Sequence, residues 1–174
     1  MPRLRRAPAA GAASARLPAG YATWSRVAVA LGSNLGDRAA HLDYAVTRLR
    51  DLLACSIVSS YVESAPVDVA GEQGPFLNAA VIGRFGGTPR ALLTGLLAIE
   101  GERGRERPHR GAARTLDLDL ILFGDVTADE PDLALPHPRF RERRFVLEPL
   151  AQVAGEWRDP VTGLTVAQLL ARLD

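Results

Sequence analysis

The pattern of apolar and polar positions predicts four strands and two helices in the middle of the chain. Short apolar runs bounded by turn residues predict strands over 26–31, 57–62, 77–85 and 116–123. Apolar residues at helical spacing predict one helix over 38–54 and another that ends near Glu102, the second capped by Thr88 with Pro89 at its first position. The order β-α-β-β-α-β favours an α+β protein with a ferredoxin-like core, in which helices cover one face of an antiparallel sheet.

The C-terminal third has weaker patterning, and we expect it to be an elaboration on that core. It contains a Pro-His-Pro stretch at 136–138, an apolar run over 145–150 and a final helix near 165–173. We therefore expect a single domain over 26–174. Residues 1–25 are rich in Ala, Arg and Pro. This favours a disordered N-terminal extension, or translation from an upstream start codon, over a transit peptide, because prolines and glycines interrupt any long amphipathic helix.

The composition narrows the possible partners. With 174 residues, of which 47% are hydrophobic and 24% charged, the chain suits one domain with a substantial core. The net charge of +1 argues against a general attraction to nucleic acid or to an anionic membrane. No window approaches the roughly 18 consecutive apolar residues of a membrane helix. We expect a monomeric, cytoplasmic protein that binds small molecules and neither nucleic acid nor membranes.

The types of basic residue and the cysteine content exclude several mechanisms. All 21 basic residues are arginine. Without lysine the chain cannot form a Schiff base, use a lysine as general base or carry a P-loop of the GKS or GKT type. Cys55 is the single cysteine, which excludes an intramolecular disulfide and a zinc site built from cysteines. We expect Cys55 to pack as a small apolar residue where helix gives way to strand.

Two carboxylates in the last predicted strand are the strongest candidates for chemistry. Asp117 and Asp119 are two residues apart in an apolar run, so their side chains point the same way, with Cα atoms about 6.5 Å apart. Such a pair can bind hard cations, which prefer oxygen ligands. A solvated strand face would also alternate polar with apolar residues. The metal interpretation is the stronger one because five arginines precede the pair, at 103, 105, 107, 110 and 114.

The arginine-rich segment itself predicts phosphate binding. Guanidinium groups suit bidentate contacts with phosphate, and a loop can stay open until a substrate arrives and then close over it. The alternative is a solvated, charge-rich loop in which Glu102 and Glu106 are the local partners of the arginines. Together with the carboxylates, the segment favours magnesium and a polyphosphate as ligands.

Three other motifs each allow two interpretations. His137, between two prolines, is either a loop histidine or a donor that contacts phosphate. Phe76 and Asn78 either fill the core or stack on and hydrogen-bond a flat heterocycle. The segment 32–36 follows a strand and opens a helix, yet it lacks the spacing of known phosphate-binding loops. We interpret it as a tight turn with a capping Asn or Asp.

Four segments, taken in order, resemble the family of 6-hydroxymethyl-7,8-dihydropterin pyrophosphokinase, an enzyme of the folate pathway. They are Leu31 to Gly36 (LGSNLG), Phe76 to Ala80 (FLNAA), Arg114 to Asp119 (RTLDLD) and Leu135 to Pro138 (LPHP). The likeness runs from about residue 26 to about residue 150. It implies a ferredoxin-like α+β fold, and transfer of pyrophosphate from ATP to the pterin hydroxymethyl group with release of AMP.

The resemblance also implies roles for individual residues. Two magnesium ions are expected at Asp117 and Asp119, which form the catalytic group with Arg105 and Arg114. The residues expected to bind the nucleotide are Glu100, Arg105, Arg107, Arg114, His137 and Arg143. The residues expected to bind the pterin are an aromatic pair, an amide and two loop positions: Phe76, Phe145, Asn78, Ser64 and Val67.

The chain departs from the family's pattern in two places. Where Arg-Trp-Gly-Pro-Arg is common, residues 110–114 read Arg-Gly-Ala-Ala-Arg, and Pro138 stands where an aromatic residue is often found. The missing indole and proline imply a more flexible loop whose closing costs more entropy. We therefore expect weaker nucleotide retention or slower closure than in relatives, which replacing Gly111 by Trp would reverse.

Two other functions suit the same fold class. An RNA-binding module needs aromatic residues spaced along its central strands for base stacking, and the third and fourth predicted strands offer few. A nucleotidyl transferase or cyclase with two metal ions on a related sheet would release pyrophosphate instead of AMP. The products of the reaction with ATP therefore separate these alternatives.

Overall fold

The structure, a computed structural model, describes residues 24–67, 73–104 and 112–174. At its centre is a five-stranded sheet in which every strand pairing is antiparallel. The strands lie in the order β2-β4-β1-β5, and β3 pairs with the beginning of β4. Their bounds are β1 (Ser25–Ser33), β2 (Ala54–Val58), β3 (Val62–Ser64), β4 (Phe76–Phe85) and β5 (Asp117–Phe123).

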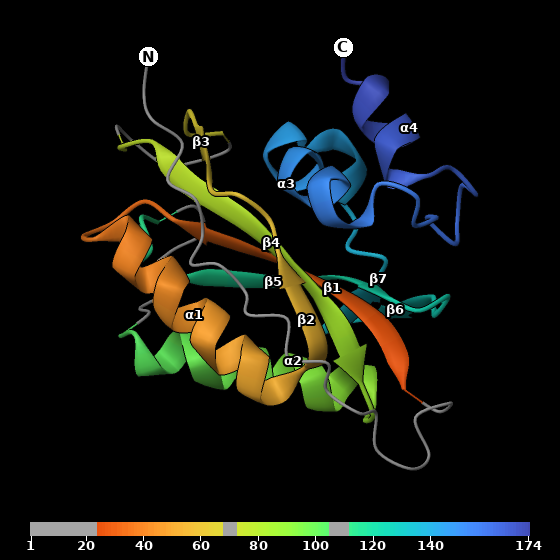
Figure 1. Cartoon of the computed structure of the whole chain (residues 1–174), viewed down its shortest axis with the longest axis horizontal. Helices are drawn as coiled ribbons and strands as arrows, with labels where there is room; N and C mark the ends of the chain where they lie inside the picture. The colour runs from red at the N-terminus through yellow and green to blue at the C-terminus, as the bar shows by residue number, and fades with distance from the viewer. Residues whose placement is uncertain (1–23, 68–72, 105–111) are drawn as a thin grey trace.

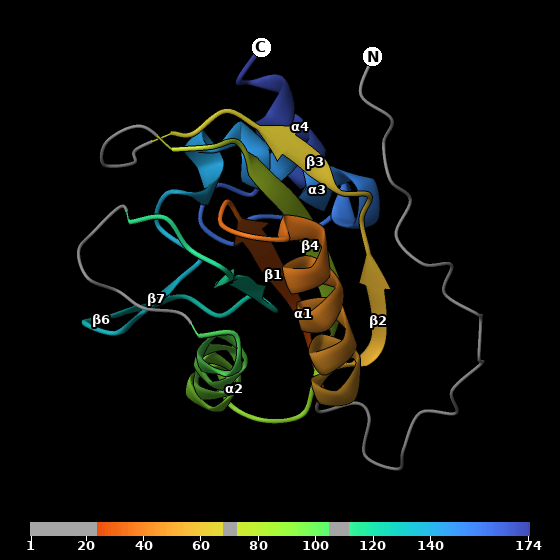
Figure 2. The same ribbon diagram turned by 90° about the vertical axis from the view of Figure 1, so that its left-hand side faces the viewer.

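Helices lie on both sides of this sheet (Figures 1 and 2). One side holds α1 (Arg38–Leu52) and α2 (Pro89–Glu102), and the other holds α3 (Arg144–Ala154) and α4 (Val166–Ala171). The segment between β5 and α3 forms a small hairpin and a 3-10 turn: β6 (Ala128–Glu130), β7 (Leu133–Leu135) and η2 (Phe140–Glu142). The expected mixed α/β architecture with an antiparallel sheet is confirmed, and the C-terminal third supplies the second helical layer.

Alternation along the central strand β1 separates two apolar cores. Val27, Val29 and Leu31 pack in the cluster that includes α1 and α2, whereas Ala28 and Ala30 pack in the cluster that includes α3 and α4. Successive side chains of a strand point to opposite faces, so one buried strand serves both cores. All five of these residues are buried.

The helix starts follow the capping residues. The Thr88 hydroxyl accepts a hydrogen bond from the Ala91 N–H at 3.2 Å, and Pro89 is the first residue of α2, as predicted. In the turn before α1, the Asp37 carboxylate accepts from the Ala40 N–H at 3.0 Å. Each bond satisfies a backbone donor in the first turn that has no partner within the helix.

The second predicted strand, 57–62, was wrong in its bounds. The chain instead forms β2, which begins at Ala54, and the separate short strand β3. The pairing of β2 with β4 shifts between Ala54 and Ile57, and Cys55 within this bulge has a φ of +51°. Cys55 is also exposed, so the expectation that it packs as an apolar residue was wrong. A bulge turns side chains away from the regular alternation, which periodicity alone does not reveal.

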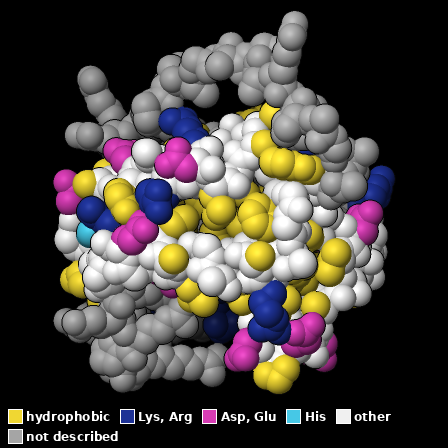
Figure 3. All heavy atoms as spheres, turned by 90° about the horizontal axis from the view of Figure 1, so that it is seen from below, with side chains coloured by type: hydrophobic (Ala, Val, Ile, Leu, Met, Phe, Trp, Pro, Cys, Tyr) yellow, Lys and Arg dark blue, Asp and Glu magenta, His cyan; other side chains and the backbone are white. Residues whose placement is uncertain are grey.

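Polar and charged side chains connect α1 to α2 on the outer surface of this layer. The Arg48 guanidinium donates to both carboxylate oxygens of Glu102 at 3.0 Å, and the Tyr44 hydroxyl donates to the same carboxylate at 2.5 Å. Seen from below, charged side chains of both signs lie near one another at the rim of this face (Figure 3). These exposed pairs contribute little to stability compared with the apolar core beneath them.

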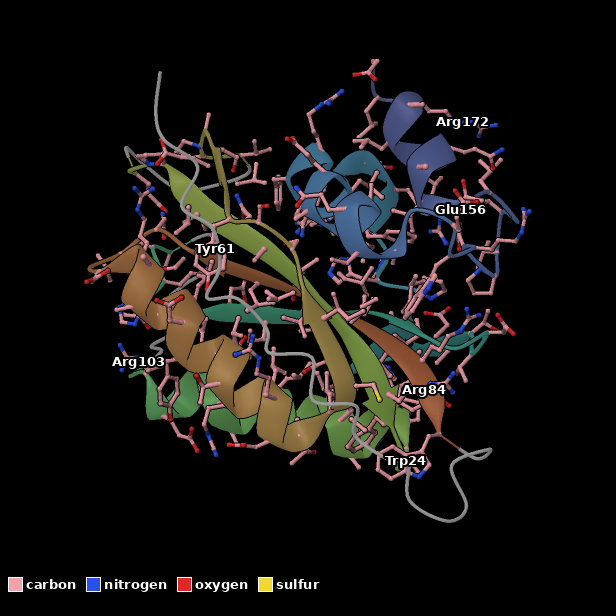
Figure 4. The ribbon with its side chains drawn as sticks, viewed as in Figure 1. Trp24, Tyr61, Arg84, Arg103, Glu156 and Arg172 are labelled. Atoms are coloured by element: carbon pink, nitrogen blue, oxygen red, sulfur yellow. The ribbon has the colours of Figure 1, made fainter. Side chains whose placement is uncertain are left out.

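The first strand starts at an end of the sheet marked by Trp24 and Arg84 (Figure 4). The Arg84 guanidinium donates to the Trp24 carbonyl at 3.4 Å, and β1 begins at the next residue, Ser25. The remainder of the expected N-terminal extension, residues 1–23, lies outside the described residues. No helix in the described ranges combines the length and the apolar character needed to cross a membrane.

Candidate functional site

Polar side chains gather at the opposite end of the sheet, on the face covered by α3. Because the strands are antiparallel, the end of β1 meets the beginnings of β4 and β5 there. Gly32 in β1 pairs with Asn78 on one side and with Asp117 on the other. Residues opposite one another in a sheet share a face. The face that packs Ala28 and Ala30 against α3 thus continues into these polar positions.

The two aspartates begin β5 next to an arginine. Asp117 pairs with Gly32 and Asp119 with Ala30, so both carboxylates lie on this face. The Arg114 guanidinium donates to Asp117 Oδ2 at 2.5 Å. The side chains of Asp117 and Asp119 are 17% and 35% exposed, which leaves carboxylate oxygens within reach of a ligand.

His137 and Arg143 approach Asp119 from the C-terminal segment. His137 Nε2 lies 3.9 Å from Asp119 Oδ2, and Arg143 Nη1 lies 4.0 Å from the same oxygen. The backbone N–H of His137 donates to the Ile121 carbonyl at 3.0 Å, which fixes the loop against β5. One segment that follows β5 in the sequence therefore brings both a histidine and an arginine to a carboxylate of that strand.

The His137 ring is neutral at physiological pH. Burial, together with the positive charges of Arg143 and Arg139, lowers the pKa of His137 to about 4. The Arg139 N–H donates to His137 Nδ1 at 3.3 Å, so the neutral ring carries its proton on Nε2, the nitrogen that faces Asp119. His137 can therefore act as a neutral hydrogen-bond donor to an anionic oxygen.

Three of the expected pterin residues, Ser64, Phe76 and Asn78, lie on β3 and β4, across β1 from the aspartates. The amide of Asn78 is buried and donates to the Val62 carbonyl at 3.2 Å and to Ser64 Oγ at 2.9 Å. Phe76 pairs with Ser64, and the Arg114 guanidinium carbon lies 5.9 Å from the Phe76 ring centroid. Arg114 thus contacts both the aspartate pair and the aromatic ring.

Phe145 enters from the first turn of α3, which packs against β3 and β4. The Arg143 guanidinium carbon lies 5.5 Å from the Phe145 ring centroid. Phe76 and Phe145 are thus each next to an arginine that contacts one of the two aspartates. Val67, the remaining expected pterin residue, is 55% exposed at the end of a described range.

Glu100 contacts the backbone of β5 from α2. It is 2% exposed in α2, and its Oε1 accepts from the Leu118 N–H at 2.7 Å. This contact holds the backbone of β5 between Asp117 and Asp119. The expected nucleotide contact of Glu100 stays a prediction. Arg105 and Arg107, also expected to bind the nucleotide, lie outside the described residues.

The sequence did not identify Asn34 as a residue that organises the site. Its Oδ1 accepts from the Arg114 N–H at 2.9 Å, and its Nδ2 donates to Gln73 Oε1 at 2.7 Å. The Asn34 N–H donates to the Arg114 carbonyl at 3.2 Å. Asn34 therefore ties the end of β1 to the segments that precede β4 and β5. Asp37, and not Asn34, is the capping residue of this turn.

The chemistry of the donors suits magnesium. Among the described residues no group of three or more His, Cys, Asp or Glu side chains is placed to hold a metal ion. Magnesium, however, is usually bound by one or two carboxylates, with water and substrate phosphates as the other ligands. Asp117 and Asp119 meet that requirement, and Arg114, Arg143 and His137 add donors for phosphate oxygens.

Comparison with known proteins gives a consistent result. Residues 28–155 match the model of a family described as 7,8-dihydro-6-hydroxymethylpterin-pyrophosphokinase. Two relatives named 2-amino-4-hydroxy-6-hydroxymethyldihydropteridine pyrophosphokinase are 38% identical (Synechocystis sp.) and 40% identical (Bacillus subtilis). The alignments cover 84% of this chain and 75% of the first relative, and 80% of this chain and 84% of the second.

The fold also resembles solved structures. Plasmodium falciparum HPPK-DHPS superposes with a TM-score of 0.67 at 16% identity. The match covers 86% of this chain and 44% of that one, so this chain spans less than half the length of that solved protein. At this identity the likeness concerns the fold alone.

Proposed function

The chain belongs to the family of 7,8-dihydro-6-hydroxymethylpterin-pyrophosphokinases, and we infer from this that it transfers pyrophosphate from ATP to 6-hydroxymethyl-7,8-dihydropterin. The products are AMP and the pterin diphosphate. This reaction is a step in folate biosynthesis, and ATP is its co-substrate.

One observation about the site supports this function most directly. An aspartate pair with adjacent arginines, suited to a metal-bound polyphosphate, begins β5, while Phe76 and Asn78 begin β4. The two sets flank Gly32 on neighbouring strands of one sheet face. A flat heterocycle on β4 would therefore have its substituent next to the phosphates.

A ferredoxin-like topology is part of this proposal. The elements follow one another as β1, α1, β2, β4, α2 and β5, with the short β3 inserted before β4. The strand order β2-β4-β1-β5 places β1 and β4 in the centre, and α1 and α2 cover one face. Both features support the split β-α-β arrangement of that fold.

Asp117 and Asp119 are proposed to hold two magnesium ions. Magnesium bound there would neutralise charge on the phosphate oxygens. Arg114 and Arg143 add positive charge beside each carboxylate, and His137 adds a neutral donor. Arg105 and Arg107, which lie outside the described residues, are proposed to contact the triphosphate. Glu100 is proposed to act near the nucleotide while it supports β5.

The pterin is proposed to lie between the rings of Phe76 and Phe145. Asn78 would hydrogen-bond the edge of the heterocycle, because its buried amide is already oriented by Val62 and Ser64. The polar groups of the segment from Ser64 to Val67 would form further hydrogen bonds with this edge of the heterocycle. A site oriented by existing hydrogen bonds loses little entropy when the ligand binds.

The reaction needs positioning more than covalent catalysis. The hydroxymethyl oxygen attacks the β-phosphorus of ATP, the bond between that phosphorus and the bridging oxygen of the α-phosphate breaks, and AMP leaves with that oxygen. The hydroxyl group releases its proton to the solvent. Arg114, which contacts both Asp117 and the Phe76 ring, is placed to hold the two substrates in register. Positioning and electrostatic stabilisation then supply most of the rate enhancement.

An assay of the products tests the proposal. The purified chain, given ATP, magnesium and 6-hydroxymethyl-7,8-dihydropterin, should form AMP and the pterin diphosphate in equal amounts. Release of pyrophosphate instead would indicate a nucleotidyl transferase or cyclase. If ATP with magnesium did not bind while single-stranded RNA did, the chain would be an RNA-binding module. We further propose that the protein acts as a monomer, which sedimentation of the active protein would test.

A further inference from the structure

Gly32 lies at the centre of the site and has no side chain. We propose that Gly32 is a specificity-determining position: the missing side chain leaves the floor on which the pterin lies. The inference rests on the proposed function, because it assumes that the substrate occupies the face between Phe76, Asn78 and Asp117.

The exposure of Gly32 is unusual for its place in the sheet. β1 has a neighbouring strand on each side, and residues 27–31 and 33, all within the described part of the chain, are buried. Gly32 is partly exposed. Residues 27–31 are covered on both faces, so the partial exposure of Gly32 marks the point where the cover on the α3 side stops.

Neither packing nor backbone conformation requires a glycine at this position. A Cβ built on Gly32 would lie 3.6 Å from Asn78 Oδ1 and 3.8 Å from Phe76 Cδ1, which are ordinary van der Waals distances. Gly32 is not among the glycines with positive φ. By contrast, a Cβ on Gly83 in β4 would lie 3.0 Å from Leu53 Cβ and 3.2 Å from the Ala54 carbonyl oxygen, so close packing accounts for that glycine.

A glycine in a strand costs stability, which gives the observation its weight. Glycine destabilises the interior of a strand relative to alanine, because it loses more conformational freedom on folding. Alanine fits at position 32 without a clash. The volume that a methyl group would fill lies directly beside the two side chains proposed to bind the ring. Glycine at this position therefore leaves room for a ligand at a cost in protein stability.

The neighbours of Gly32 identify the ligand that uses this volume. Asn78, with its buried amide, lies on one side, and Asp117, with its carboxylate, lies on the other. A flat ring against Phe76 with a substituent that reaches toward Asp117 has to cross Gly32. A side chain here would lift the ring from the sheet and misalign the amide of Asn78.

Binding measurements with Gly32→Ala and Gly32→Val test the inference. The pterin Kd, measured with a nonhydrolysable ATP analogue and magnesium present, should rise at least about tenfold for Gly32→Ala and further for Gly32→Val. The Kd of the ATP analogue alone should stay within about twofold of the wild-type value. Gly101→Ala, in α2 with nothing within 4 Å of its added Cβ, is the matched control and should change neither constant.

The possible outcomes separate the inference from the function. If the wild type forms AMP from the pterin and Gly32→Ala keeps the wild-type pterin affinity, the inference fails and the function stands. The inference also fails if the variant loses affinity for pterin and nucleotide equally, because a fold defect then explains both. If the wild type forms no AMP with the pterin, the proposed function itself fails. Gly32→Ala decides the matter alone if Gly32→Val does not fold.

Discussion

The two faces of the central sheet have different tasks, although the same strands build both. On the side of α1 and α2 the inward residues are apolar from Val27 to Leu31 in β1 and from Leu118 to Phe123 in β5. On the side of α3 the apolar residues stop at Ala30, and Gly32, Asp117 and Asp119 follow. The difference indicates that the first face stabilises the fold, while the second does so only along part of its length and then presents the site.

The largest expected effect comes from removing the carboxylates of the second face. Asp117→Ala and Asp119→Ala should each lower kcat by about 10²–10³-fold or more, because the proposed magnesium ligands and their electrostatic stabilisation are lost. Thermal unfolding should change little, since both side chains are partly exposed. AMP release under saturating substrates measures the effect. Asp129→Ala, on the exposed strand β6, is the control. Near-normal rates in both aspartate variants would refute their proposed roles.

Replacing Leu118, the residue between the two aspartates, should lower the stability of the protein and leave its activity nearly unchanged. Leu118 is 3% exposed and packs on the α1 and α2 side. Leu118→Ala should cost about 3 kcal/mol of unfolding free energy, because a cavity remains in a packed core. Well below its melting temperature the variant should keep kcat within about threefold. Denaturant unfolding and the AMP assay together measure the changes in stability and in kcat.

The control is Leu97→Ala, at a position that is 46% exposed on α2, and it should change neither stability nor kcat. Equal losses of activity in Leu118→Ala and Asp119→Ala would show that the two faces are not separable.

The sequence alone predicted the features that depend on local periodicity. A period of two placed Asp117 and Asp119 on one face, and capping chemistry placed the start of α2 at Pro89. The sequence did not predict the contacts that join distant segments. Asn34 bonds residues 39 and 80 positions away, and neither partner is recognisable from local spacing.

The same limit applies to Glu100 and to the second strand. The bond from the Leu118 N–H to Glu100 exists because α2 packs beside β5, which no local pattern encodes. The bulge at Cys55, with its positive φ, breaks the alternation on which the strand prediction relied. Motifs therefore predicted residues that the fold brings together, whereas the contacts that support those residues became visible only in three dimensions.

The C-terminal layer that covers the second face contains a buried carboxylate, so the stability of this layer should fall in acid. Asp159 is fully buried and accepts from Arg141 Nε at 2.7 Å, Thr162 Oγ1 at 2.6 Å and the Val161 N–H at 3.1 Å. Burial alone raises the pKa of Asp159, but these hydrogen bonds outweigh it and lower the pKa to about 2. The native state therefore binds this proton less readily than the unfolded chain does.

A pH series of unfolding tests this. The stabilisation is present above the unfolded pKa near 3.8 and is lost as the pH falls toward 2, which amounts to about 2 kcal/mol. Wild type should therefore lose about that much more stability between pH 5 and pH 2 than Asp159→Asn, which cannot titrate at this position. Parallel curves for the two proteins would mean that the ion pair with Arg141 does not support the C-terminal layer.

The smallest expected effect separates two parts of the second face: the residues proposed to bind the pterin ring and the charged residues proposed to bind the nucleotide. Asn78→Ala should raise the pterin Kd about 3-fold to 10-fold, because the proposed hydrogen bond to the ring edge would contribute roughly 0.5–1.5 kcal/mol. Its effect on the Kd of the ATP analogue should stay within about twofold, since the amide bonds Val62 and Ser64 and not the aspartates. Ser59→Ala is the matched control, because its buried hydroxyl accepts from the Ala80 N–H of the same strand, away from the site. The control should lower stability without changing the pterin Kd. If both variants weakened pterin binding equally, the effect of Asn78 would come from the fold of β4 and not from contact with the ring.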